Sequence, residues 1–353
     1  MRILNRFITI IAFAAVITFA FAACDSSGGG DGPPPPIPYT ITGSVGDGFT
    51  AESGGLTKAA GDPIQDVIEA IKADANGAAV TIQFGEGTNL NIGTSSVSFN
   101  NTDGTWGSIT LSGGITSSIP NGLTQGTIMV ESPVNIISTG TIINTASGGS
   151  AIYLTGAGTL TVSGGIVQGS NTARAICLRS GTVSLTLTGG TVQASTGVAI
   201  VAFSGHINIS GNALVTSASS TDQAIELADN DSTLLHMSGG TVRNTSSSYA
   251  IATYSSHTEG MVISGGTVQA NGTAIFNYRS GGIIISGANT LITSSHSTNG
   301  TINLLDNSGY GGTLTVSSGT VQNTGGGPSI TKGASATVNI TSPPAVIQPE
   351  FEP

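Results

Sequence analysis

Charged side chains are scarce in this chain of 353 residues, since Asp, Glu, Lys and Arg together make up 8% of it, against about 25% in a typical soluble protein. Cations are the rarer kind: 9 Lys and Arg face 19 Asp and Glu, for a formal net charge of −10. So few cations cannot neutralise a row of phosphates, which argues against nucleic-acid binding. The same shortage argues against a basic surface that binds anionic lipid.

Aromatic residues and cysteines are also few. Phe, Trp and Tyr make up 5% of the chain, whereas there are 52 glycines, and this composition fits short strands and tight turns better than a helix bundle. Hydrophobic residues still reach 38%, which is enough to form a core. The only cysteines are Cys24 and Cys177, so a disulfide scaffold is not expected.

The first 23 residues have the pattern of a secretory signal. Arg2 and Arg6 precede an uncharged apolar stretch over residues 7–21, and small residues follow before Cys24. The ending Phe21–Cys24 resembles the relaxed lipobox of spirochaete, treponeme-like lipoproteins, with Phe21 in place of the usual Leu. Ordinary signal cleavage beside the two alanines is the alternative.

The resemblance to a lipobox implies that Cys24 becomes a lipidated N-terminus. Residues 24–38 are rich in Gly, Ser and Pro, a composition typical of a tether that holds a folded domain away from a membrane. We therefore expect an exported protein whose lipid anchors it to the cell envelope, at the outer membrane or the cell surface.

A repeat of about 25 residues runs through the chain. Tripeptides similar to Ser-Gly-Gly recur from Ser112 to Ser317, and an Ala-Ile pair recurs in the same phase from Ala151 to Ala274. Each copy holds three short runs in which β-branched and polar residues alternate, which predicts three strands. This predicts an all-β, single-stranded parallel β-helix of roughly 8–9 turns, because a propeller blade needs four strands and about 40 residues.

The copy Ile263–Tyr278 indicates how one turn is built. Ile263 and Val268 should face the core, and Gly265–Gly266 should turn a corner that requires a positive φ. The isoleucines of the Ala-Ile pairs should stack in one inward row, which includes Ile225, Ile251 and Ile275.

A helix is predicted over residues 63–75, before the repeat begins. Its apolar residues fall on one face at i, i+3, i+4 and i+7 from Ile64. Asp62 should be the N-cap, Gln65 has capping-box spacing, and Asn76–Gly77 should end the helix.

A helix followed by a strand resembles the N-terminal cap of pectate-lyase-like right-handed β-helix proteins. The resemblance covers Asp62 to Ile340 and implies a right-handed fold, but says nothing about activity. We predict a cap region over residues 39–105, the parallel β-helix over 106–342 and a tail rich in Pro and Glu over 343–353.

Catalytic residues, metal sites and cofactors are not predicted. The densest acidic group consists of Asp222, Glu226, Asp229 and Asp231. Paired carboxylates can act as acid and base or bind Ca²⁺, but the counterparts of Glu226 one turn away are Val201 and Ala252. A solvated loop is the favoured interpretation of this group, and an acidic active site is the alternative.

The scarce aromatic residues gather on one predicted face. Residues two and four positions after the Ala of an Ala-Ile pair should point outward, and they include Arg179, Phe203, Tyr254, Phe276 and Tyr278. Such side chains can stack on sugar rings or on a partner protein. Packing between neighbouring strands is the alternative interpretation.

We therefore expect a non-catalytic structural or adhesive module that binds polysaccharide or the surface of a host or neighbouring cell. One alternative is a polysaccharide lyase or glycoside hydrolase on the same fold. A repeat surface coat without a specific ligand is the other.

Overall fold

The computed structural model describes residues 33–53, 56–57, 63–120, 124–132, 134–179, 182–228, 233–307, 310–341 and 345–350. The predicted signal segment and Cys24 lie outside the described residues, as do Asp62, Asp229 and Asp231. The chain divides into Met1–Pro35 and Pro36–Pro353, and the fold below belongs to the second unit. Within the described ranges, no helix has the length and apolar character needed to cross a membrane.

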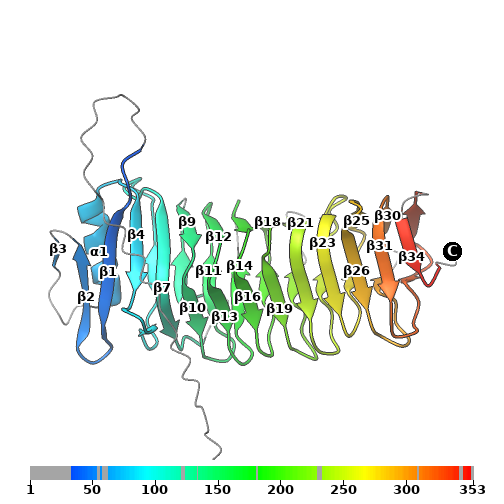
Figure 1. Ribbon diagram of the computed structural model, residues 1–353, viewed down its shortest axis with the longest axis horizontal. Helices are drawn as coiled ribbons and strands as arrows, with labels where there is room; N and C mark the ends of the chain where they lie inside the picture. The colour runs from blue at the N-terminus through cyan, green and yellow to red at the C-terminus, as the bar shows by residue number, and fades with distance from the viewer. Residues whose placement is uncertain are drawn as a thin grey trace, which may run out of the picture. The chain divides into compact units, whose positions relative to one another are not determined.

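Pro36–Pro353 forms a right-handed parallel β-solenoid of about 10 turns with about 26 residues per turn (Figure 1). This confirms the predicted fold class, with somewhat more turns than expected. Each turn adds one strand to each of three parallel ladders, which we number by their order along a turn. Neighbouring turns therefore satisfy each other's backbone hydrogen bonds, as a solenoid requires.

The first and second ladders are joined because three long strands pass through the corner between them. The first ladder contains β4 (Val80–Phe84), the first half of β7 (Ile109–Ser117), β9 (Asn135–Ser138), β12 (Thr159–Val162), β15 (Ser184–Leu187), β18 (Gly205–Ile209), the first halves of β21 (Thr233–Asn244) and β23 (Met261–Ala270), β25 (Gly282–Ile285), β30 (Thr313–Val316) and β33 (Thr337–Ile340). The second contains β5 (Leu90–Asn91), β10 (Thr141–Asn144), β13 (Ile166–Gly169), β16 (Thr191–Ala194), β19 (Leu214–Ser217), β26 (Thr290–Ser294), β31 (Gly319–Asn323), β34 (Ala345–Gln348) and the second halves of β7, β21 and β23.

The third ladder is a separate sheet of ten strands. It contains β6 (Val97–Phe99), β8 (Ile128–Val130), β11 (Ser150–Leu154), β14 (Arg174–Leu178), β17 (Ile200–Ala202), β20 (Ile225–Leu227), β22 (Ile251–Thr253), β24 (Ile275–Asn277), β27 (Ile302–Leu304) and β32 (Ile330–Lys332). Two short strands, β28 (Asp306–Asn307) and β29 (Tyr310–Gly311), pair antiparallel just after β27 in the sequence.

The core consists of inward side chains stacked turn on turn. Ile225 pairs with Ile251, and Ile251 pairs with Ile275, in successive strands of the third ladder. All three are fully buried, as are Ile263 and Val268 of the first and second ladders. The predicted inward row is therefore confirmed.

Parallel pairing extends beyond the predicted boundaries of the β-helix at both ends. β4 already pairs in parallel with β7, before residue 106, and β34 pairs in parallel with β31, after residue 342. On its other edge β4 pairs with β1 (Ile37–Ser44), which continues antiparallel into β2 (Gly48–Ser53) and β3 (Leu56–Thr57).

Helix α1 (Ile64–Ala75) is present as predicted, but its start differs. Pro63 is the N-cap rather than the first helical residue, and no side chain caps this end. Asn76 adopts a left-handed conformation with φ 44° and donates its N–H to Lys72 O, which confirms the predicted C-cap. The apolar face, which includes Val67 and Ile68, is buried.

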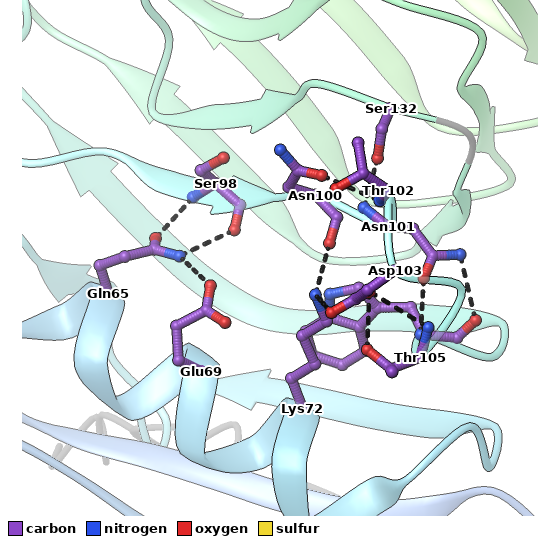
Figure 2. Close-up of polar contacts among 11 residues, drawn as sticks. Gln65, Glu69, Lys72, Ser98, Asn100, Asn101, Thr102, Asp103, Thr105 and Ser132 are labelled. Atoms are coloured by element: carbon purple, nitrogen blue, oxygen red, sulfur yellow. Dashed lines mark hydrogen bonds and ion pairs between the residues drawn. The ribbon is translucent and has the colours of Figure 1, made fainter.

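Gln65 joins α1 to the third ladder instead of completing a capping box (Figure 2). Its Oε1 accepts from Ser98 N at 2.8 Å, and its Nε2 donates to Ser98 O at 3.1 Å. The amide thus pairs with strand β6 as another strand would. Lys72 adds a second link, because its Nζ donates to Asn100 O and forms an ion pair of 2.9 Å with Asp103. That α1 protects this end of the solenoid stays a prediction.

Candidate binding face on the third ladder

The outer face of the third ladder carries two rows of the predicted surface residues. In the first row, Val201, Glu226, Ala252 and Phe276 are paired in successive strands. The second row lies just after the strands and is also fixed by the backbone, because Tyr254 N donates to Leu227 O and Tyr278 N donates to Thr253 O. The predicted neighbours of Glu226 are therefore confirmed.

Arg179 and Phe203 form one group on this face. The guanidinium carbon of Arg179 lies 4.6 Å from the centre of the Phe203 ring, a cation–π contact. Phe203 is half-buried and packs against a small apolar cluster that contains Cys177 and Val201. Burial raises the pKa of the Cys177 thiol to about 11. The arginine lies over the ring and the ring packs on the sheet, and a role of this group in binding stays a prediction.

Four aromatic residues form a second group, which we call the tyrosine cluster: Tyr249, Tyr254, Phe276 and Tyr278. Tyr249 stacks on Phe276 with ring centres 4.4 Å apart and planes at 10°. Tyr278 lies 5.8 Å from Phe276 and 5.2 Å from Tyr254, tilted against both. Phe276 is only 7% exposed because Tyr249 covers it, so it supports the cluster rather than presenting a free ring.

The three tyrosines provide the accessible part of the cluster. Each is half-buried, and none of their hydroxyls forms a hydrogen bond with another residue that the structure describes. Burial raises the pKa of Tyr249 and Tyr254, so these hydroxyls stay protonated over the physiological range. The cluster therefore offers aromatic faces together with free donors and acceptors.

Tyr249 was not among the predicted residues. It directly precedes an Ala-Ile pair and therefore lies in the turn before β22, where a strand alternation assigns no direction to a side chain. Its position next to the repeated Ala-Ile pair was the only feature of the sequence that pointed to a place near this face.

Glu226 lies one strand before the tyrosine cluster. Its carboxylate is half-buried and accepts a hydrogen bond from the Gln223 side-chain amide. Burial raises the pKa of Glu226; the Arg174 charge and the Gln223 hydrogen bond oppose this shift, and Asp222 adds to it. The Glu226 carboxylate also raises the pKa of Tyr254, for which burial is the larger cause. Glu226 and Tyr254 of the tyrosine cluster thus share one electrostatic environment.

Asp222, the other described member of the predicted acidic group, is a turn residue. Its Oδ2 accepts from Ser219 Oγ at 3.2 Å and from Thr221 Oγ1 at 3.4 Å, and its N–H donates to Ser219 Oγ at 2.9 Å. Across the described part of the chain, no group of three or more His, Cys, Asp or Glu could hold a metal ion. Asp222 therefore matches turn chemistry, whereas Glu226 lies on strand β20.

No protein-family model, curated protein or solved structure matches this chain. Its function must therefore be argued from the residues of the face itself.

Proposed function

We propose that this chain is a non-catalytic adhesive module that is anchored by a lipid and binds carbohydrate through its tyrosine cluster. The observation that carries the proposal is the placement of Tyr254 and Tyr278 one above the other, with ring centres 5.2 Å apart and their hydroxyls free of described partners. Aromatic faces stack on sugar rings, and free hydroxyls can hydrogen-bond to them.

Rigidity favours binding at this face. Backbone hydrogen bonds to neighbouring turns fix Tyr254 and Tyr278, and the buried Phe276 supports the ring of Tyr278. Side chains that are ordered before binding lose little conformational entropy when a ligand arrives. An open sheet face suits a long polymer better than a small molecule that needs enclosure.

Anchoring is proposed from the sequence. The signal-like segment, Cys24 and the Gly, Ser and Pro-rich residues 24–38 have the order that a lipoprotein requires. The resemblances to spirochaete lipoproteins and to pectate-lyase-like β-helix proteins agree with this arrangement, and the solenoid fold supports the second.

An enzyme on the same fold is the second candidate, and the raised pKa of Glu226 favours it. A glycoside hydrolase needs a second carboxylate facing the first, whereas Asp222 is held in its own turn. Turnover of polysaccharides by the wild type that is lost in Glu226→Gln would establish this candidate instead.

Replacing Tyr254 and Tyr278 together by Ser should weaken binding to a glycan array about tenfold or more, because two stacking surfaces are lost. Replacing both by Phe keeps the rings and separates stacking from hydrogen bonding. Phe203→Ser is the matched control, since that ring is covered by Arg179. Unchanged binding by a folded double Ser variant, with folding checked by circular dichroism, contradicts the proposal.

Radiolabelled palmitate should label the wild-type protein in a bacterium that processes lipoproteins, and Cys24→Ala should remove the label, because acylation needs that thiol. Cys177→Ala is the control: this thiol is buried in the solenoid and should not affect labelling. An unlabelled wild type, or label that persists in Cys24→Ala, rules out the proposed anchor.

A further inference from the structure

We infer that the carbohydrate site selects sugars that carry a free amino group, in the form of an ammonium ion, over acetylated and acidic sugars. This inference rests on the proposed function and deepens it. Two features point to it: the half-buried carboxylate of Glu226 lies beside the tyrosine cluster, and this carboxylate receives a single hydrogen bond from the described residues.

The Glu226 carboxylate has bonding capacity left for a ligand. Among the described residues it receives one hydrogen bond, from Gln223 to Oε2, and Oε1 has no partner. A carboxylate can accept several hydrogen bonds, so Oε1 is free to accept from an ammonium group. Hydrogen bonds between two charged groups are stronger than neutral ones.

Arg174 does not neutralise Glu226 by direct contact. It acts on the Glu226 charge, but its described hydrogen bond runs from Nη1 to Gly148 O at 3.4 Å, and it forms no ion pair with a described residue. Asp222 adds a second negative charge near Glu226. Arg279 follows Tyr278 in the sequence but is not among the groups that act on Glu226 or Tyr254.

The tyrosine rings favour the same class of ligand. The face of an aromatic ring attracts cations within about 6 Å of its centre, and Tyr254 and Tyr278 lie in the row next to Glu226. A sugar ammonium can therefore interact with a carboxylate while its ring stacks on a tyrosine. A uronic acid is repelled by Glu226 and by the net charge of −10 on the chain. An N-acetyl group carries no charge to be attracted.

The pH dependence follows from the sign of the Glu226 shift. Burial raises the pKa of Glu226, so its carboxylate becomes neutral at a higher pH than an exposed glutamate does. The preference for amino sugars should be complete above that raised pKa, while the sugar amine is still protonated. It should be lost as the pH falls through the pKa of Glu226, because the neutral acid does not attract an ammonium ion.

Three oligosaccharides of equal length test the inference by calorimetry: chitosan fragments, the corresponding N-acetylated chitin fragments and oligogalacturonate. The wild-type protein should bind the chitosan fragment about tenfold more tightly than the acetylated one, and the galacturonate least. Glu226→Gln should abolish this preference by weakening binding of the chitosan fragment. Glu259→Gln is the control for net charge, because Glu259 is exposed in a turn, and it should retain the preference.

The outcomes separate the inference from the proposed function. Equal binding of the amino and acetylated fragments, still weakened by Tyr254→Ser with Tyr278→Ser, overturns the inference and leaves the proposed function in place. A preference that persists in Glu226→Gln also overturns it, because attraction to the overall negative charge then explains the result. Absence of binding to every fragment in the wild type contradicts both.

Discussion

Replacing Asn244 by Ala should lower the free energy of unfolding by about 3 kcal/mol, because three backbone groups lose their hydrogen-bond partner at once. Asn244 is 1% exposed. Its Nδ2 donates to Ser219 O at 3.1 Å and to Asp222 O at 2.9 Å, and its Oδ1 accepts from Ser246 N at 2.8 Å. The side chain thus links two successive turns of the solenoid at the corner between the second and third ladders.

Asn208→Ala is the matched control for this substitution. Asn208 lies on β18, is half-buried, and its side chain has no described hydrogen bond, so its loss should change stability by no more than about 0.5 kcal/mol. Urea denaturation of both variants measures the difference. Similar effects for the two asparagines would mean that the corner bonds do not stabilise the fold.

The same corner also bears on the binding face. Asp222 O, one of the hydrogen-bond partners of Asn244, belongs to the residue that directly precedes Gln223 in the chain. Gln223 in turn bonds the Glu226 carboxylate. We therefore expect Asn244→Ala to disturb Glu226 as well as to destabilise the solenoid.

Replacing Gly266 by Ala should lower the free energy of unfolding by about 3 kcal/mol, through two effects that act together. Its φ of +84° is unfavourable for a residue with a side chain, at about 1–2 kcal/mol. In addition, a Cβ on Gly266 would lie 2.6 Å from Gly240 O in the turn before it. Because the stacked backbone cannot move away without breaking ladder bonds, the contact adds to the conformational strain.

Gly87→Ala separates the two effects. Gly87 has a similar φ of +77°, but a Cβ there would meet no atom within 4 Å, so only the conformational cost of about 1–2 kcal/mol applies. Thermal or urea denaturation of both variants provides the comparison. An equal loss of unfolding free energy in the two variants would show that the backbone stacked against Gly266 accommodates a methyl group.

The ladders could be predicted from the sequence because a parallel solenoid turns spacing directly into contact. The Ala-Ile pairs recur in one phase, so Ile225, Ile251 and Ile275 had to lie above one another. The same reasoning gave Val201 and Ala252 as the neighbours of Glu226. It failed at the edges of the repeat, where β4 and β34 have no clear copy of the motif.

The tyrosine cluster could be predicted only in part. Alternation along a strand indicates which side a residue occupies, but not which ring lies over which. The burial of Phe276 depends on Tyr249, a turn residue whose direction no period fixes. The buried asparagines were missed for a related reason, since Asn beside Ser and Gly is typical of a solvated turn. Their signal was positional, because each ends a strand: Asn144, Asn244 and Asn323 in the second ladder and Asn277 in the third.

The parallel register has a kinetic consequence. Each turn pairs only with the turns before and after it, about 26 residues away, so no long loop has to close before the next contact forms. Folding can start at any well-formed pair of turns and spread in both directions, as in other repeat arrays. A chain that emerges from its N-terminal end can thus add one turn at a time, and each completed turn offers the next an ordered edge.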